Sequence, residues 1–269
     1  MGRYAHRYKS LLIASLCWLW AAPPTHAQVP VLEPFDHKLR YDVYWNGLPL
    51  GRIRMEGRED AFGYQLSVDT KTRGIVRLFD ETKSLITARG RIDSDTGAYV
   101  PQRYDSVSRN DKETKSTAIR YDAEGLIKTR KRVPPDDPAN RPPVPLEEAN
   151  EGLNPLTAML QLRHALRDNI AINERTTVLR SYDGARLADF TFKVVSRASL
   201  EVLGEHRNAI NVVMTRTPIA GYKQKELKKI AEGEPVVHVF FSADAAFIPL
   251  EATIKLRFGM IELKLTEQQ

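Results

Sequence analysis

The residues best able to do chemistry in this chain are its histidines, its serines and one cysteine, and their spacing favours no catalytic or metal site. Beyond residue 27 the histidines are His37, His164, His206 and His238, which lie far apart and lack the paired spacing of a zinc-binding helix. No serine stands in the Gly-x-Ser-x-Gly setting of an exposed nucleophile. We therefore expect no cofactor and no metal, and a hydrolase with an unrecognised site is the least favoured interpretation.

Arg163 is the most unusual charged residue, because it falls within the apolar arc of a predicted helix. At helical spacing its position lies between those of Leu156 and Met159. A buried charge needs a partner or a path to water. Two interpretations stay open: Arg163 holds an anionic headgroup inside a cavity, or it pairs with an internal Asp or Glu or extends its head to water.

Four aromatic residues and one histidine on predicted strands are candidates for lining an apolar ligand site. They are Tyr41, Trp45, His238, Phe240 and Phe258. Aromatic rings bury large areas and often line such sites. In this interpretation the rings surround an acyl chain, and Arg163 or His238 orients its polar end. The alternative is that these residues are ordinary core residues and that His238 is a hydrogen-bonded strand histidine.

A dense group of lysines is a further candidate surface. It consists of Lys223, Lys225, Lys228 and Lys229, around a short helix predicted at 224–231. Each lysine near an anionic lipid surface contributes about 1 kcal/mol, so contact with lipid or lipopolysaccharide is one interpretation. Glu226 dilutes the positive charge, which favours a solvated helix face instead.

Residues 1–27 predict a cleavable export signal. A basic start is followed by an apolar run over 11–22, by Pro23-Pro24 and by a small residue, Ala27, at the predicted cleavage site. The run is too short for a transmembrane helix, which needs about 20 apolar residues. We expect cleavage after Ala27, a periplasmic location and no transmembrane span. Cys17 leaves with the signal, so the remaining chain holds no thiol.

The chain without this signal is close to neutral. Three of the 40 basic residues lie within 1–27, which leaves 37 against 34 acidic residues. The two signs are interspersed, and no basic face with interleaved aromatic residues is evident, so we expect no nucleic-acid partner. The remaining residues, 28–269, fit one large β-rich domain.

Alternation of apolar and polar residues predicts antiparallel strands along most of the chain. Leu39, Tyr41, Val43 and Trp45 alternate with polar residues and end at Asn46-Gly47, a tight hairpin turn. The same pattern predicts strands at 48–55, 64–70, 84–92, 102–108, 117–121, 126–131, 176–181, 186–195, 200–203, 208–215, 236–241, 250–258 and 261–265.

Two segments interrupt the strand pattern. Six of the 16 prolines fall within 133–148, which predicts an extended loop. A helix is predicted over 155–167, with Asn154 as its N-cap and Pro155 at its first position. Its apolar residues cover a wide arc, so the helix requires burial against a large apolar surface. A curved sheet provides such a surface.

Several motifs together resemble a family of exported bacterial proteins known as domain of unknown function 3108. The motifs are Tyr41-Asp-Val-Tyr-Trp-Asn-Gly47 with Leu50-Gly51, the segment 72–74 after Gly63-Tyr64, Tyr99-Val-Pro101, Asn154-Pro-Leu-Thr-Ala-Met-Leu-Gln-Leu-Arg163 and Ile248-Pro-Leu250. Asn154 replaces the aspartate usual in the family, a conservative exchange at a cap. The resemblance implies a fold and a compartment without an activity. The chain is also similar to β-spiral envelope proteins and, more distantly, to half-barrel lipoprotein carriers.

These observations predict a mainly β protein in which one antiparallel sheet, curled into an open barrel or spiral, wraps around one central helix. The favoured function is a non-enzymatic periplasmic protein of the cell envelope that binds an apolar or lipid-like ligand. The alternative is an envelope scaffold with a packed core that binds a protein partner. The two differ in whether the sheet encloses an empty apolar cavity.

Overall fold

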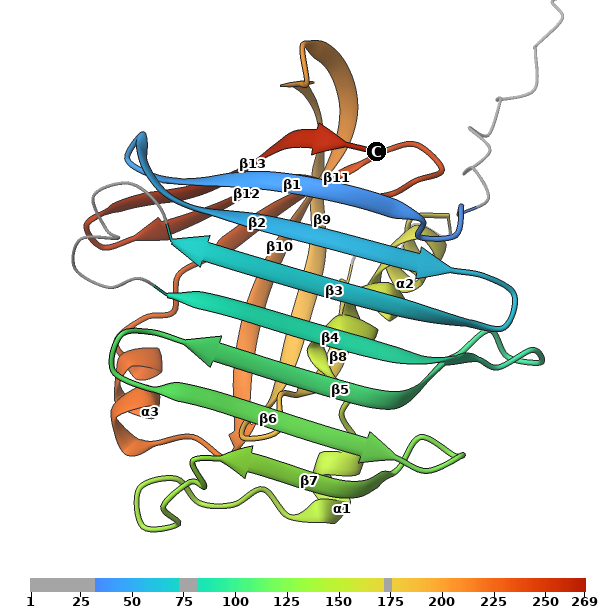
Figure 1. The fold of residues 1–269 in the computed structure, drawn as a ribbon. Helices are drawn as coiled ribbons and strands as arrows, with labels where there is room; N and C mark the ends of the chain where they lie inside the picture. The colour runs from blue at the N-terminus through green and yellow to red at the C-terminus, as the bar shows by residue number, and fades with distance from the viewer. Residues whose placement is uncertain (1–31, 73–81, 172–175) are drawn as a thin grey trace, which may run out of the picture.

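One antiparallel sheet, curled around a helix, forms the fold. The computed structural model describes residues 32–72, 82–171 and 176–269, so the predicted signal 1–27 and residues 73–74 of the family motif lie outside the described residues. Thirteen strands pair in the order β7-β6-β5-β4-β3-β2-β1-β13-β12-β11-β10-β9-β8 (Figure 1). The strands are β1 (His37–Trp45), β2 (Leu48–Glu59), β3 (Gly63–Thr72), β4 (Lys83–Ile92), β5 (Tyr99–Arg109), β6 (Thr114–Tyr121), β7 (Ile127–Val133), β8 (Thr176–Tyr182), β9 (Leu187–Val202), β10 (Glu205–Ala220), β11 (Val237–Ser242), β12 (Pro249–Leu256) and β13 (Gly259–Gln268). The helices are α1 (Leu146–Asn150), α2 (Pro155–Ala171) and α3 (Gln224–Ala231).

The sheet is curled but not closed into a barrel, and the end of α1 with the residues after it bonds to both edge strands, β7 and β8. On the β7 side, the Ile127 N–H donates to Asn150 Oδ1 at 2.8 Å. On the β8 side, the Leu153 N–H donates to the Arg180 carbonyl at 3.1 Å, and the Tyr182 N–H donates to the Leu153 carbonyl at 2.9 Å. These bonds satisfy part of each edge, which leaves less of it open to another chain.

Helix α2 begins where the sequence predicts it. Asn154 is fully buried, and its Oδ1 accepts the Thr157 N–H at 3.1 Å, which is an N-cap bond. The helix continues past the predicted end at 167 to Ala171. The reason is that Ile170 continues the apolar spacing of Leu162 and Leu166 and packs against the core cluster that contains them, and no glycine or proline stops the backbone within 168–171.

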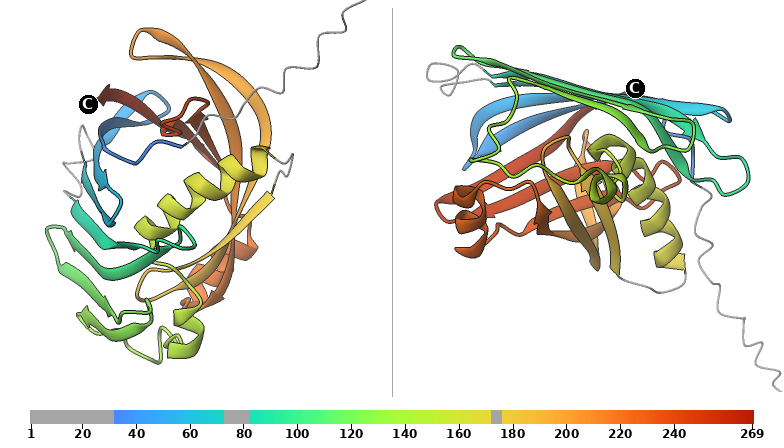
Figure 2. Two further views of the ribbon diagram at one scale, coloured as in Figure 1. Left: turned by 90° about the vertical axis from the view of Figure 1, so that its right-hand side faces the viewer. Right: turned by 90° about the horizontal axis from the view of Figure 1, so that it is seen from below.

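Both sides of α2 are packed against the sheet, which explains its wide apolar arc. Leu156 and Leu160 belong to a core cluster that includes side chains of β1–β7. Leu162 and Leu166 belong to a second cluster with side chains of β9–β11. Figure 2 shows α2, in yellow, between these two halves of the sheet. The predicted mainly β fold, with one curled antiparallel sheet around a central helix, is confirmed.

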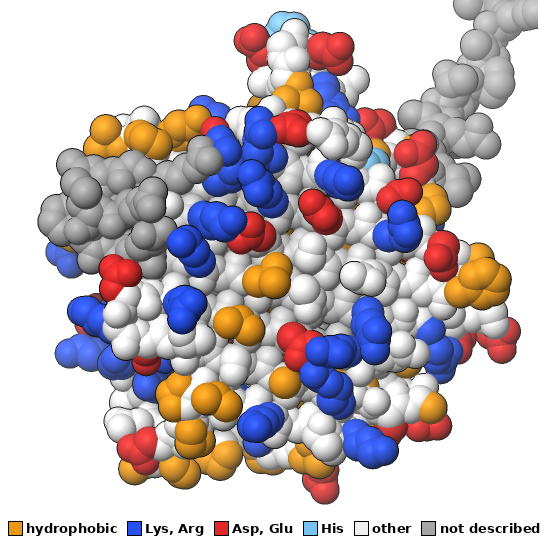
Figure 3. All heavy atoms as spheres, viewed as in Figure 1, with side chains coloured by type: hydrophobic (Ala, Val, Ile, Leu, Met, Phe, Trp, Pro, Cys, Tyr) orange, Lys and Arg blue, Asp and Glu red, His pale blue; other side chains and the backbone are white. Residues whose placement is uncertain are grey.

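The face of β1–β7 that points away from α2 carries many charged side chains. Figure 3 shows Lys and Arg side chains spread over it among Asp and Glu. Arg52 and Asp42 form an ion pair there at 2.8 Å, and Arg120 pairs with Asp105 at 2.9 Å. The outer surface of these strands therefore carries ion pairs in water, together with exposed apolar side chains such as Leu85 and Val107.

Several strand boundaries differ from the prediction by a few residues, and two differences have a clear physical cause. The segments predicted as separate strands at 186–195 and 200–203 form the single long strand β9, because a bulge at Val195 opposite Asn211 shifts the alternation without ending the ladder. The predicted proline-rich loop 133–148 contains the start of α1 at Leu146. A helix of five residues is too short to show a helical period in the sequence.

Candidate functional site

A cavity of about 420 Å³ lies between α2 and the strands β8–β11. From the helix it is lined by Ala158, Met159 and Leu162, and from β9 by Ala188, Phe190 and Phe192. Met214 of β10 and Val239 and Phe241 of β11 complete its apolar wall. The cavity occupies the concave side of the sheet, where the curl holds strands and helix apart.

Strand alternation makes this wall apolar. Phe190 and Phe192 are two residues apart on β9 and point to the same face, as do Val239 and Phe241 on β11. The Phe241 ring stacks on Phe247, with the ring centroids 5.3 Å apart. Packing of this kind fixes the position of the wall.

One end of the cavity is polar. Asp183, Arg186, Arg216 and Tyr222 line it there. Arg186 donates from Nε to Asp183 Oδ2 at 2.9 Å, and Arg216 donates from Nε to Glu234 Oε1 at 2.8 Å. The Arg216 Cζ also lies 5.8 Å from the centroid of the buried Tyr222 ring. Two guanidinium groups therefore stand at one end of an apolar cavity.

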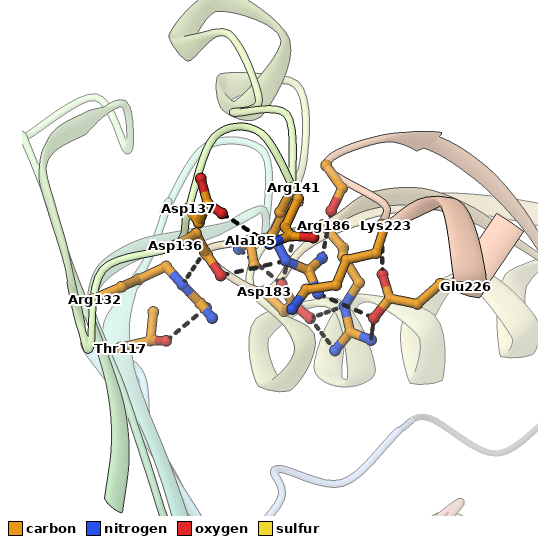
Figure 4. Close-up of polar contacts among 12 residues, drawn as sticks. Thr117, Arg132, Asp136, Asp137, Arg141, Asp183, Ala185, Arg186, Lys223 and Glu226 are labelled. Atoms are coloured by element: carbon orange, nitrogen blue, oxygen red, sulfur yellow. Dashed lines mark hydrogen bonds and ion pairs between the residues drawn. The ribbon is translucent and has the colours of Figure 1, made fainter.

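A network of charged residues supports this end of the cavity (Figure 4). The buried Arg141 donates from Nη2 to Glu226 Oε1 at 3.0 Å and from Nη1 to the Gly221 carbonyl, and its Nε lies 3.3 Å from Asp136. Glu226 also lies 3.8 Å from Arg186. The network joins the loop after β7, the turn between β8 and β9, and α3.

The ionised forms of Glu226 and Arg216 are stabilised by their hydrogen-bond partners. Burial acts to raise the pKa of Glu226, but the Lys223 N–H and the guanidinium groups of Arg141 and Arg186 lower it below its usual range. The hydrogen bond to Glu234 raises the pKa of the Arg216 guanidinium. Both groups therefore stay ionised at neutral pH.

The predicted ligand-lining residues do not lie at this cavity. The strand residues His238 and Phe240 point to the face of β11 opposite Val239 and Phe241, and His238 Nδ1 lies 3.1 Å from Asn211 Oδ1. Trp45 lies at the end of β1, and Phe258 lies in the turn after β12 with 76% of its surface exposed.

Tyr41 contacts a residue that lines the cavity but does not line it itself. Its buried hydroxyl donates to the carbonyl of Pro249, a residue that lines the cavity, at 2.8 Å. Its side chain is packed in the core rather than exposed to the cavity.

Arg163 is buried away from the cavity and bonded within the core. Its Nη2 donates to the carbonyls of Ala246 at 2.6 Å and Glu33 at 3.2 Å, and its Nη1 lies 3.6 Å from the Glu59 carboxylate. The Phe35 ring centroid is 4.8 Å from its Cζ. Of the two interpretations of Arg163, this geometry matches pairing with an internal carboxylate.

A second polar cluster lies around Glu59, and its hydrogen bonds indicate which groups donate and which accept. The Tyr99 hydroxyl donates to Glu59 Oε1 at 2.7 Å and lies 2.8 Å from His164 Nε2. Because the hydroxyl has one proton, His164 Nε2 donates to the Tyr99 oxygen. Burial lowers the pKa of His164, which favours the neutral ring.

Three of the four predicted lysines, Lys225, Lys228 and Lys229, lie in α3. Lys223 precedes the helix, and its N–H donates to Glu226 Oε2 at 2.8 Å, while the other three side chains are exposed. Lys228 and Lys229 lie in the last turn, where positive charge stabilises a helix. Lys229 also lines a smaller cavity of about 180 Å³ that shares Arg186, Arg216 and Tyr222 with the larger one.

The residues that line the cavity were not predicted from the sequence as a binding site, although the sequence contains one signal for them. Phe190 and Phe192 alternate on a segment that the sequence predicts to be a strand. No local pattern relates that segment to α2 or to Arg216, because their proximity depends on the curl of the whole sheet.

The wall of the larger cavity is apolar, with charged side chains at one end. Among the described residues that line the larger cavity there is no histidine and no cysteine. Within 32–72, 82–171 and 176–269, no group of three or more His, Cys, Asp or Glu side chains is placed to hold a metal ion. In the same ranges, no helix combines the length and apolar character needed to cross a membrane.

A family comparison accounts for most of the sequence. The model of the family described as protein of unknown function (DUF3108) matches residues 40–266. The chain belongs to the DUF3108 family. Membership confirms the resemblance seen in the sequence motifs and assigns no activity. No curated protein matches this DUF3108 chain significantly.

Comparison with solved structures finds proteins similar to this DUF3108 protein to different degrees. A β-barrel-like protein of domain of unknown function DUF1849 from Brucella abortus has a TM-score of 0.53 at 14% identity, covering 89% of this chain and 98% of that one. A candidate lipoprotein from Parabacteroides distasonis has a TM-score of 0.36 at 10% identity, covering 89% and 97%. A candidate exported protein with a YmcC-like fold from Bacteroides fragilis has a TM-score of 0.32 at 7% identity, covering 90% and 98%. The first supports the β-barrel-like fold, and the other two carry no argument.

Proposed function

We propose that this DUF3108 protein is a non-enzymatic protein of the cell envelope that binds the apolar chain of a lipid-like ligand between α2 and β8–β11. One observation carries the proposal: a cavity of about 420 Å³ with an apolar wall and a few polar groups at one end. Sites for small ligands commonly measure ~300–1,000 Å³ and have this composition. Burial of apolar surface is the driving force.

A scaffold with a packed core is the competing function. An apolar cavity reduces stability when nothing fills it, because its walls lose packing contacts. A scaffold gains nothing from such a space, whereas a carrier requires it. The bonds between residues 150–153 and both edge strands also leave less free edge for strand addition by a partner.

The proposal includes export to the periplasm, which rests on residues 1–27. Expression of the full chain followed by cell fractionation and intact mass measurement tests this part. We expect a periplasmic protein whose mass corresponds to a start after Ala27. A full-length protein retained in the cytoplasm would contradict it.

A chain-length series tests the binding itself. Isothermal titration with straight-chain acids from octanoic to octadecanoic acid should show one saturable site. Each added methylene buried in the cavity contributes ~0.8 kcal/mol, so Kd should fall about fourfold per methylene until the cavity is full. Heats that do not saturate with any chain, or a Kd independent of chain length, would contradict the proposal.

A further inference from the structure

The polar end of the cavity and the smaller cavity beside α3 meet at the same residues. Arg186, Arg216 and Tyr222 line both spaces. A molecule whose apolar chain lies between α2 and β9 therefore has its other end next to two guanidinium groups.

Positive and negative side chains balance at this junction, three of each, when every residue that lines either space is counted once. Of the described residues that line the smaller cavity, Arg186, Arg216 and Lys229 are cationic, and Glu226 and Glu234 are anionic. Along the larger cavity the same two arginines face one carboxylate, Asp183. Binding of an anionic group here therefore depends on guanidinium donors that these carboxylates leave free, and not on a net charge.

The arginines also have hydrogen-bonding capacity to spare. Arg216 directs Nε and Nη2 to Glu234, and within the described part of the chain its Nη1 has no hydrogen-bond partner. Arg186 directs Nε and Nη2 to Asp183, and its Nη1 lies 3.8 Å from Glu226, beyond hydrogen-bond distance. Guanidinium forks bind carboxylates and phosphates well because their donors are planar and fixed.

We infer that the ligand is a single-chain amphiphile with an anionic headgroup, a carboxylate or a phosphate, that binds Arg186 and Arg216 while its chain fills the larger cavity. The inference rests on the proposed function, since the headgroup site has meaning only if the cavity holds a chain. Tyr222, which lies between the two spaces, packs where chain and headgroup join. Lys229 adds a third positive charge at the outer side.

The test compares three ligands of equal chain length: dodecanoic acid, dodecyl phosphate and dodecanol. Each is titrated into the wild-type protein and into a variant, Arg216→Gln with Glu234→Gln, that removes one ion pair without changing the net charge. The matched control is Arg180→Gln with Asp189→Asn, which removes an ion pair on β8 and β9 whose residues do not line either cavity. The alcohol reports whether the chain cavity is intact in each variant.

We expect the wild type and the control to bind an anionic ligand roughly tenfold more tightly than the alcohol, the lower end of what a hydrogen bond to a charged group contributes. The Arg216 variant should lose this preference and keep its affinity for the alcohol. A tighter phosphate indicates a phospholipid-derived ligand, and a tighter carboxylate indicates a free fatty acid.

Two results would overturn the inference. One is equal affinity of the wild type for acid, phosphate and alcohol, and the other is an unchanged preference in the Arg216 variant. Either leaves the proposed binding of an apolar chain intact. If none of the three ligands binds, the proposed function fails as well, so the two failures are distinguishable.

Discussion

Replacement of Arg163 by methionine is expected to destabilise the protein strongly. Arg163 is fully buried at the centre of the fold and bonds to the carbonyls of Glu33 and Ala246 and, through an ion pair, to Glu59. Methionine keeps most of the apolar stem but removes every donor. Three backbone carbonyls, those of Glu33, Ala246 and Phe247, then lose a hydrogen bond, and the Glu59 charge stays buried without a cation.

The size of this effect follows from the burial of the pair. Removal of one partner from a buried ion pair costs about 3–5 kcal/mol. For a protein of this size, 1 kcal/mol shifts the melting temperature by about 2–4 °C, so we expect a fall of roughly 6–20 °C. The matched control is Arg180→Met, which breaks a half-exposed pair with Asp189. Pairs of that kind contribute about 0–1 kcal/mol, so the control should melt within ~4 °C of the wild type.

The free energy of unfolding is measured by urea denaturation followed by circular dichroism. A double variant tests whether the unpaired Glu59 charge causes the loss. Adding Glu59→Gln to Arg163→Met removes the uncompensated charge and keeps one oxygen acceptor, for either the Phe35 N–H or the Tyr99 hydroxyl, which bond to different oxygens of the Glu59 carboxylate. The double variant should therefore be more stable than the sum of the single changes, by ~0.5–3 kcal/mol. An Arg163→Met protein within 1 kcal/mol of the wild type, or strict additivity, would refute the assignment of Arg163 to the core.

Further outcomes concern α2 and the buried histidines. Leu160→Asp, which places a charge at a fully buried position, should prevent folding, and an unchanged melting temperature would show that α2 is not enclosed. Asn154→Ala should lower the free energy of unfolding by about 1 kcal/mol through loss of the N-cap bond. An unchanged free energy would show that this bond does not stabilise the helix. Burial lowers the pKa of His164 and of His37 from 6.5. Since the unfolded chain then binds protons at higher pH than the folded one, stability should be fully present above pH 6.5 and decline below it, and a melting temperature that stays flat or rises on acidification between about pH 7 and pH 5 would contradict this.

The sheet could be predicted because its signals are local. Asn46 and Gly47 both have positive φ, 47° and 81°, as the tight turn read from the sequence requires. The start of α2 also depends on neighbours in sequence, through the bond from Thr157 to Asn154. The length of β9 was not predictable in this way, because the bulge at Val195 inverts the alternation in mid-strand.

The site was less predictable because it depends on relations between distant segments. The sequence identified Arg163 as unusual but left two interpretations open, and only the position of Glu59, 104 residues earlier, distinguishes them. Arg216 showed no such anomaly, since an arginine on a strand near the surface is ordinary. Its place at the end of an apolar cavity results from the curl that brings β10 alongside α2.

Titration of a fluorescent long-chain fatty acid into a cavity-blocked variant tests the central claim most directly. Ala158→Phe fills the cavity from α2, and Ala61→Phe adds the same side chain at an exposed turn as its control. We expect saturable binding of one ligand by the wild type and by Ala61→Phe, and at least a tenfold weaker affinity for a folded Ala158→Phe. No saturable binding by the wild type, or equal affinity in the two variants, would contradict the account.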